Sequence, residues 1–203
     1  MARDSETGKS IRVEKLTYKE WYKKYVDGET ENYNNTQKKE SINLFNSIYE
    51  WKEVPKDKSK KVKDLQIWKH EGKEYKVDGK YVVLDYSKHE KEVADVIANK
   101  YGKDIKMVPR VLNPPGIKTP DYIMNGEKLD LKVINSRGRN AFYNALRKNK
   151  KQADRFIFDL KDEFEEEWLN EQINSIFGSN HYRCIKEIII YSDGKIIKAI
   201  KRK

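Results

Sequence analysis

The chain has 203 residues, of which 37% are hydrophobic and 37% are charged, and its net charge at pH 7 is +10. The single cysteine excludes an intrachain disulfide, and no apolar run is long enough for a transmembrane helix or a secretion signal. The 11% aromatic content argues against wholesale disorder. A basic surface attracts polyanions, so nucleic acid is the leading expected partner and a membrane is not expected. Lysine enrichment from an AT-rich genome is the alternative origin of this charge.

The N-terminal part is expected to contain two helices followed by a basic linker. Residues 16–26 and residues 37–51 both place apolar side chains at near-helical spacing, so each segment predicts an amphipathic helix. Residues 54–62 are rich in lysine, and we interpret them as a solvated linker, with phosphate binding as the alternative. We treat residues 1–64 as an N-terminal helical region with its linker.

A change of pattern follows at residue 87. Two glycine-containing turn signals divide residues 65–86 into a small β-meander. Residues 87–101 predict a helix, because Ser87 is a good N-cap and Glu90 lies at the third position of a capping box. Gly102 is a suitable C-terminal stop.

The element order after residue 87 predicts a mixed β-sheet flanked by helices, in the α/β (α+β) class. The expected elements are a strand (105–109), a hairpin (119–134), a helix with a positive face (136–155), a buried strand (156–160), an acidic helix (162–177) and a last hairpin (187–200). We expect residues 65–203 to form one domain with its core at residues 87–160.

Residues 119–132 read TPDYIMNGEKLDLK and carry the clearest signal for chemistry. Asn125-Gly126 predicts a type I′ turn between two strands, because both residues accept a positive φ. A two-residue turn here sets Asp121 opposite Asp130, so both carboxylates lie on one face of the hairpin. At about 5 Å and an effective dielectric near 20, these charges repel by about 3 kcal/mol. A bound cation would turn this repulsion into attraction.

The same face of the hairpin also carries Lys132 and Thr119. The other face is apolar and is expected to meet the core through Tyr122, Met124, Leu129, Leu131 and Val133. Paired carboxylates hold hard divalent ions such as Mg²⁺, and such an ion activates water and neutralises phosphate charge. Lys132 would orient the water or stabilise developing charge. The alternative is a surface salt-bridge cluster in which Lys132 compensates two aspartates.

The residues at 120–121 (PD) and 130–132 (DLK) resemble the PD-(D/E)XK nuclease signature, and residues 88–98 resemble the first core helix of that fold. The wider string HEKEVA, MVP, TPDYIMNG, LDLK and KKQADRFIFDL is similar to the C-terminal nuclease domains of contact-dependent inhibition (CdiA) toxins and related polymorphic toxins. This resemblance covers residues 87–160. A weaker resemblance links ARDSETGKSIRVEKLTYKEWYKKYV to the tail of phage minor-head proteins, to which such toxin domains are sometimes fused.

The resemblance implies a PD-(D/E)XK nuclease-like core with a metal site. Asp121 and Asp130 would be metal ligands, although the family more often has Glu at the position of Asp130, and Lys132 would assist the water. The acidic residue of the first helix corresponds to Glu90 or to Glu92. Glu90 is preferred because the first turn usually approaches the site, and helix capping alone is its alternative role. The expected ion is Mg²⁺, with Mn²⁺ or Zn²⁺ as alternatives.

Further site residues are expected around the helix at residues 136–155. In the family, a Gln or Lys at the position of Gln152 often approaches the active site, and an ordinary exposed helix residue is the alternative. His89 is a candidate general acid or base or an uninvolved surface residue. The basic side chains expected to contact phosphate, or else to form a solvated positive face, are Arg137, Arg139, Arg147, Lys148 and Lys151.

The resemblance implies a metal-dependent endonuclease toxin that hydrolyses RNA, above all tRNA, in a competing bacterial cell. It also implies a cognate immunity protein that holds the toxin inactive. A DNA endonuclease of the same fold and a noncatalytic phage-associated module that binds nucleic acid remain as alternatives. We expect action in the bacterial cytoplasm after delivery as part of a secreted or phage-borne toxin.

Overall fold

The structure is a computed structural model that describes residues 2–3, 10–11, 48–147 and 152–202. The contacts within the chain divide it into two units, Met1–Asn43 and Leu44–Lys203. In the first unit, the described elements are the short strands β1 (Ala2–Arg3) and β2 (Ser10–Ile11), which pair antiparallel. Both helices expected before residue 48 lie outside the described residues, apart from the end of the second one.

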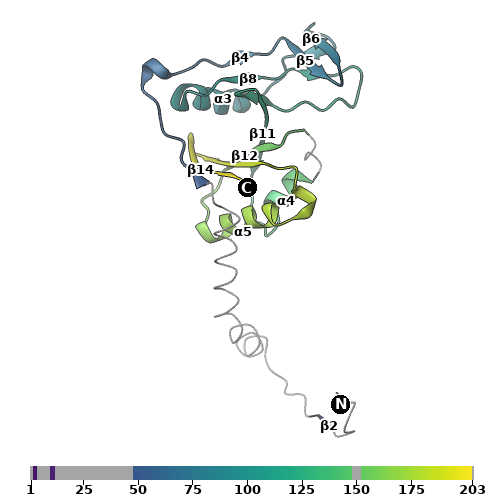
Figure 1. Ribbon diagram of the computed structural model, residues 1–203, viewed down its shortest axis with the longest axis vertical. Helices are drawn as coiled ribbons and strands as arrows, with labels where there is room; N and C mark the ends of the chain where they lie inside the picture. Colours follow the sequence, from purple (N-terminus) through teal and green to yellow (C-terminus); the bar gives the residue numbers. More distant parts are fainter. Residues whose placement is uncertain (1, 4–9, 12–47, 148–151, 203) are drawn as a thin grey trace. The chain divides into compact units, whose positions relative to one another are not determined.

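An eight-stranded mixed sheet forms the centre of the second unit (Figure 1). The strands β11, β12 and β13 run parallel to one another, and β10 and β14 pair antiparallel at either side of them. In spatial order the strands are β3 (Ile48–Tyr49), β14 (Lys195–Lys201), β13 (Glu187–Ser192), β12 (Arg155–Leu160), β11 (Glu127–Ile134), β10 (Tyr122–Met124), β8 (Ile105–Met107) and β4 (Lys63–Asp64). The predicted class, a mixed sheet flanked by helices, is confirmed.

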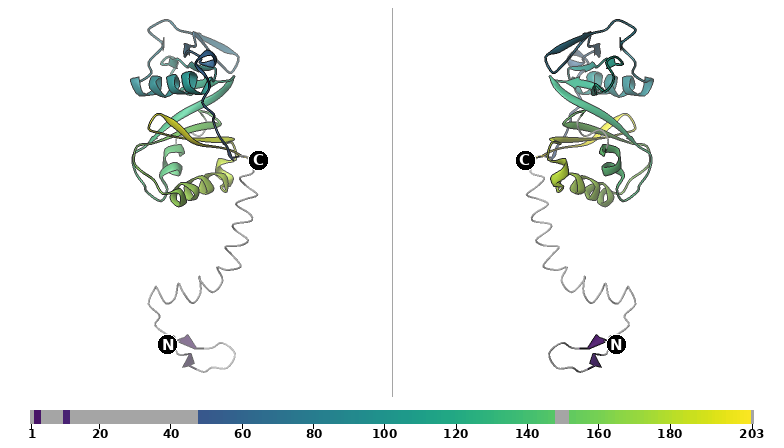
Figure 2. Two further views of the ribbon diagram at one scale, coloured as in Figure 1. Left: turned by 90° about the vertical axis from the view of Figure 1, so that its left-hand side faces the viewer. Right: turned by 90° about the vertical axis from the view of Figure 1, so that its right-hand side faces the viewer.

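Helices cover both faces of this sheet, with α3 (Lys88–Tyr101) on one side and α4 (Ala141–Leu146) and α5 (Glu166–Phe177) on the other (Figure 2). The periodic apolar residues of each helix explain this arrangement. The core under α3 takes Ile97 from the helix and Leu129 and Leu131 from β11. The core under α4 and α5 takes the alternate residues of the parallel strands and is made mainly of phenylalanine and isoleucine.

The capping box predicted for α3 is confirmed. The Ser87 hydroxyl accepts a hydrogen bond from the Glu90 backbone N–H, and the Glu90 carboxylate accepts one from the Ser87 backbone N–H. The helix ends at Gly102, which has a φ of 60° and donates its N–H to the Ala98 carbonyl. The capping box fixes the first turn of α3, which faces the site described below.

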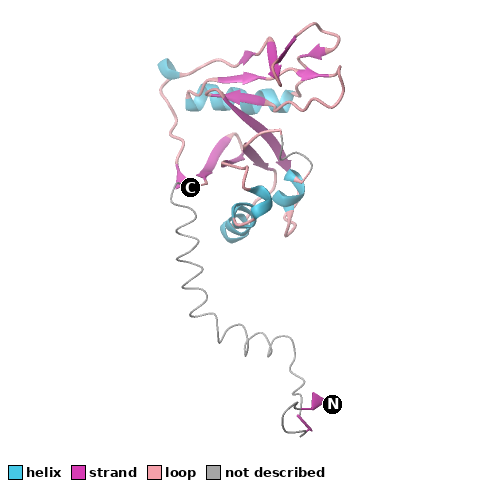
Figure 3. Ribbon diagram, turned by 45° about the vertical axis from the view of Figure 1, so that its right-hand side comes forward, coloured by secondary structure: helices cyan, strands magenta, loops and turns pink. Residues whose placement is uncertain are grey.

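The β-meander expected over residues 65–86 is only partly present. Strands β5 (Ile67–His70) and β6 (Lys73–Lys76) form a hairpin, but β7 (Val82–Val83) pairs with β9 (Arg110–Val111) instead of β6. The reason is a turn in which one carboxylate oxygen of Asp78 accepts the backbone N–H groups of three successive residues, 80–82. This turn directs the chain away from β6. Figure 3 distinguishes the strands, in magenta, from the loops that connect them.

Residues 54–62 are a fixed strap rather than the expected solvated linker. Along the C-terminal end of α3, the backbone N–H of Val54 donates to the Lys100 carbonyl at 2.8 Å, and that of Lys60 donates to the Ala98 carbonyl at 3.0 Å. A short 3₁₀ helix, η1 (Lys56–Lys58), lies between these two contacts. The lysine side chains of the strap are exposed, as expected for a solvated segment, and the backbone bonds hold the segment against α3.

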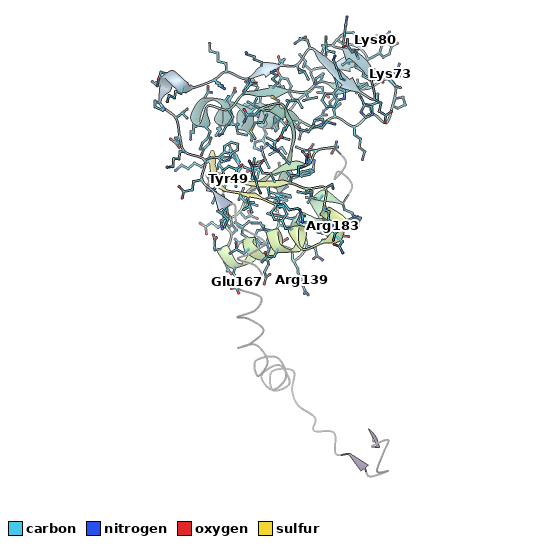
Figure 4. All side chains as sticks on the ribbon, in the orientation of Figure 1. Tyr49, Lys73, Lys80, Arg139, Glu167 and Arg183 are labelled. Atoms are coloured by element: carbon cyan, nitrogen blue, oxygen red, sulfur yellow. The ribbon has the colours of Figure 1, made fainter. Side chains whose placement is uncertain are left out.

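Three other expectations change in detail. The end of the helix predicted over residues 37–51 is instead the strand β3, because Tyr49 pairs with β14 and donates its hydroxyl to the Glu187 carboxylate (Figure 4). The positive helix predicted over residues 136–155 is described only as the short α4, which begins after Asn140. Val133 was expected in the core but is 40% exposed, because it lies near the end of β11.

The remaining elements follow the sequence pattern closely. The acidic helix is present as α5, the buried strand before it is β12, and the last hairpin is β13 with β14. A second 3₁₀ helix, η2 (Asn180–Tyr182), connects α5 to β13. Among the described residues, no helix has the length and apolar character that a membrane span requires.

Candidate active site

The hairpin register predicted from the Asn125-Gly126 turn is confirmed. Both turn residues have a positive φ, of 50° and 86°, as a type I′ turn requires. Asp121 precedes β10 and Asp130 lies in β11, next in register after the last pair of the hairpin. The paired residues are Met124 with Glu127, Ile123 with Lys128 and Tyr122 with Leu129. The turn chemistry therefore brings the two aspartates side by side.

The Asp121 carboxylate is mostly buried and accepts a hydrogen bond from the Leu131 backbone N–H at 2.8 Å. Burial raises the pKa of Asp121 to about 7, and repulsion from Asp130 adds to the rise. The Leu131 hydrogen bond and the Lys132 charge oppose it. At neutral pH this carboxyl group therefore exchanges between its protonated and ionised forms.

Asp130 is almost completely buried, with 1% of its surface exposed. Its carboxylate forms an ion pair with the Lys132 ammonium, and no backbone N–H among the described residues donates to either oxygen. Burial raises the pKa of Asp130, while the charge of Lys132 lowers it. The unused acceptor capacity of two buried oxygens is unusual, since buried carboxylates normally accept several hydrogen bonds.

An open pocket with a volume of about 270 Å³ lies directly in front of Asp121. Asp130 and Lys132 lie behind Asp121, and neither lines the pocket. The lining residues are Asp85, Tyr86, Glu90, Val108, Arg110, Val111, Leu112, Ile117, Lys118, Thr119, Pro120, Asp121 and Gln152. The pocket gives a ligand access to Asp121 from solvent.

Of the two candidate helix acids, only Glu90 lies in this pocket. Its carboxylate caps α3 and also lies 3.5 Å from the Arg110 guanidinium, so the capping role and the position at the site coexist. The Glu92 side chain is 56% exposed and faces Lys88 at 3.7 Å and His89 at 3.9 Å.

Gln152 enters the pocket, as the family resemblance implied. Its side-chain N–H donates to the Thr119 carbonyl at 3.4 Å, which links the start of β12 to the loop before β10. The amide oxygen of Gln152 is buried and has no hydrogen-bond partner among the described residues. That oxygen is a free acceptor at the site.

The predicted phosphate-binding residues are not gathered at this pocket. Arg137, Arg139 and Arg147 are exposed, and none of them lines it. Arg139 lies beside α5, where its carbonyl accepts a hydrogen bond from the Gln172 side chain at 2.9 Å (Figure 4). Lys148 and Lys151 lie outside the described residues.

Two features of this region were not found from the sequence. Arg110 lines the pocket, where its guanidinium lies 3.5 Å from both Asp85 and Glu90. Asp159, a buried residue of β12, lies 2.5 Å from His89 and 2.7 Å from Lys161. The acid inside the apolar string FIFDL was a visible signal for the second feature, whereas no sequence pattern marked Arg110.

The site fits a hydrated divalent ion better than a fully protein-bound one. In the part of the chain that the structure describes, no three His, Cys, Asp or Glu side chains are grouped to hold a metal. Mg²⁺ commonly keeps several waters and needs only one or two carboxylates. The Asp130 carboxylate, whose partner is Lys132 alone, and the unfavourable ionisation of Asp121 are the features that a cation would relieve.

Comparison with known proteins finds similarity over part of the chain. No curated protein matches the chain. A solved structure, the CdiA-CT/CdiI toxin and immunity complex from Burkholderia pseudomallei, is 27% identical and covers 56% of this chain and 82% of that chain, with a TM-score of 0.39. Residues 118–196, which include the carboxylate pair and Lys132, match the family described as the contact-dependent growth inhibition CdiA C-terminal domain.

Proposed function

We propose that this chain is a metal-dependent nuclease toxin of the contact-dependent inhibition type, which hydrolyses phosphodiester bonds in RNA. One observation carries the proposal: the half-buried carboxylate of Asp121, which lines an open pocket, lies beside the buried carboxylate of Asp130 and the ammonium of Lys132. The family match over residues 118–196 supports the toxin assignment. The sequence resemblance makes tRNA the expected substrate.

Asp121 and Asp130 would hold the ion through oxygen. When bound, a divalent cation lowers the pKa of a water and neutralises charge on the phosphate. The charge of Lys132 is now committed to Asp130, and a cation at the aspartates would free the ammonium to contact the attacking water or a phosphate oxygen. The amide oxygen of Gln152, which lacks a partner among the described residues, would accept a hydrogen bond from that water.

Arg110 would contact the substrate phosphate from the pocket wall. Its guanidinium is 49% exposed, and both of its acidic neighbours lie at 3.5 Å, a loose distance for an ion pair. A guanidinium binds phosphate oxygens with two parallel hydrogen bonds, so a phosphate would compete well for it. Glu90 would then orient Arg110 in addition to capping α3.

The proposal is tested by incubating the purified protein with total tRNA, ribosomal RNA and plasmid DNA, each with Mg²⁺ and with EDTA. Cleavage of tRNA that stops in EDTA is the expected result. Cleavage of the plasmid alone would support the DNA endonuclease alternative. Binding without metal-dependent turnover would support the noncatalytic alternative.

A toxin also needs protection in the cell that makes it. We propose that a cognate immunity protein binds this chain and that the chain acts in a target cell after delivery. Expression should arrest growth, and co-expression of a protein encoded next to the toxin should restore it. Unimpaired growth on expression of a chain shown to be folded would contradict the toxin assignment.

A further inference from the structure

The sheet face that carries Asp130 also carries a row of lysines. Lys128 lies two residues before Asp130 in β11, so both side chains point to the same face. The strand registers continue this row, because Lys128 pairs with Ile123, Ile123 pairs with Lys106, and Lys106 pairs with Lys63. The row therefore has a lysine on β11, β8 and β4, and on β10 it contains Ile123, which packs against the cluster around Trp68.

The charges in this row are not compensated by neighbouring acids. Among the described residues, no ion pair involves Lys63, Lys106 or Lys128. The acids next to them in the chain are engaged elsewhere: Asp64 accepts a hydrogen bond from Tyr86, and Glu127 pairs with Arg155. Like charges on paired strand positions are destabilising, so folding alone does not favour Lys63 opposite Lys106.

The row is held in place by its surroundings. The strap at residues 54–62 is bonded to α3, and the Leu65 backbone N–H donates to the Met107 carbonyl at 2.9 Å, which fixes Lys63 between two anchored segments. The Lys128 ammonium lies 5.3 Å from the centre of the buried Trp68 ring. These contacts lower the entropy cost of binding an anion to the row.

The dimensions suit a nucleic-acid strand. Strands lie about 4.8 Å apart, so the row extends about 14 Å from Lys128 to Lys63, and Lys128 lies about 7 Å along β11 from Asp130. Along the axis of a duplex, the phosphates of one strand recur about every 3.4 Å, so the row spans about four phosphates.

We propose that Lys63, Lys106 and Lys128 form a phosphate row that binds the nucleic-acid backbone beside the scissile bond. This inference rests on the proposed function, since it takes the carboxylate pair as the cutting site. The three ammonium groups, with no acid between them in the strand registers, match the negative charges of a phosphodiester chain.

The test compares two triple variants that lose equal charge. The row variant is Lys63→Gln/Lys106→Gln/Lys128→Gln, and the control variant is Lys88→Gln/Lys91→Gln/Lys195→Gln, which changes lysines outside the row. Binding of labelled tRNA is measured in EDTA by fluorescence anisotropy over a range of salt concentrations. Thermal unfolding confirms that each protein is folded, and a Lys63→Gln/Lys128→Gln variant replaces the triple one if Lys106→Gln unfolds it.

The row variant should bind tRNA roughly tenfold or more weakly, and the slope of log K against log salt should fall by about 2 to 3, because three phosphate contacts are lost. Equal losses in both variants, or an unchanged slope in the row variant, would overturn the inference. A row variant that keeps its affinity for tRNA but loses affinity for an acidic protein would also overturn the inference.

The two proposals fail separately. If the wild-type protein binds tRNA through the row but cleaves no nucleic acid, the row stands and the nuclease assignment falls. If the wild-type protein cleaves RNA and the row variant retains its salt slope, the row falls and the nuclease assignment stands.

Discussion

At the scale of single residues, the protonation of Asp121 is linked to the stability of the fold. Its pKa is about 7 in the folded chain because of burial and of repulsion from Asp130, whereas an unfolded aspartate has its ordinary pKa of 3.8. Between these two values the folded state binds more protons than the unfolded state. The stability contributed by protonation is therefore complete below about pH 4 and is lost as the pH rises through about 7.

This linkage predicts that Asp121→Asn stabilises the metal-free protein at about pH 8 by on the order of 2 to 4 kcal/mol. Asparagine keeps an acceptor for the Leu131 N–H and removes the buried charge. Urea unfolding in EDTA at about pH 5 and about pH 8 measures the effect, which should shrink at the lower pH. A variant as stable as the wild-type protein at both pH values would show that Asp121 is not strained by ionisation.

Metal binding should show the opposite pH dependence. A cation needs the ionised form of Asp121, so Mg²⁺ should raise the melting temperature more at about pH 8 than at about pH 6. Asp121→Asn should abolish most of this gain. The readout is thermal unfolding, which is independent of any cleavage. Equal Mg²⁺ stabilisation of both proteins would place the cation elsewhere.

One double variant separates the ion pair that Lys132 forms with Asp130 from the chemical role proposed for it. Lys132→Met leaves the Asp130 charge buried without its partner and should destabilise the fold by about 3 kcal/mol. Asp130→Asn/Lys132→Met removes both charges and should recover most of that stability while leaving the protein inactive. Urea unfolding and tRNA cleavage are measured on the same preparations. Activity in the double variant would remove both residues from the mechanism.

Contacts between residues that are close in sequence could be predicted, whereas contacts between residues that are far apart in sequence could not. Asp121 and Asp130 were placed together because a two-residue turn fixes their register. Arg110 and Asp159 were missed because their partners, Glu90 and His89, lie far away in sequence and no local rule connects them. The capping by Glu90 is confirmed because the capping box is a local pattern, whereas its role as a metal ligand stays a prediction.

At the scale of elements, the strap depends on its contact with the end of α3. A Cβ atom added to Gly102 would lie 2.9 Å from the Lys58 carbonyl oxygen and 3.1 Å from Val54, and its φ of 60° disfavours other residues. Gly102→Ala should therefore cost about 1 to 3 kcal/mol of stability. Urea unfolding measures the loss, with Gly79→Ala as a control that has a positive φ but no close neighbour. Equal losses in both variants would show that the strap is not held there.

Elements were predictable where a local pattern decides and less so where tertiary contacts decide. The α3 cap, the Asn-Gly hairpin and the last hairpin are local, and all are confirmed. The third strand expected in the meander, β7, does not pair with β6, because Asp78 turns the chain and β9 pairs with β7 instead. The strap was taken for a linker because its lysines are exposed, although its backbone is bonded.

At the scale of the whole molecule, the sheet in residues 44–203 separates two cores, one on each of its faces. Leu129 and Leu131 point to the α3 side, so Asp130 and Lys132 between and beside them must point to the other. The side chains of β11 thus alternate between the core under α3 and the candidate active site. The net charge of +10 then favours encounter with a polyanion, and this attraction should weaken as salt rises.

The most direct test of the catalytic assignment is Mg²⁺-dependent cleavage of tRNA by the wild-type protein, by Asp121→Asn and by the exposed control Glu167→Gln, all confirmed as folded. The wild-type protein and the control should cleave at the same rate, and Asp121→Asn should lose roughly 100-fold or more. Undiminished cleavage by Asp121→Asn, or cleavage that persists in excess EDTA, would contradict the account.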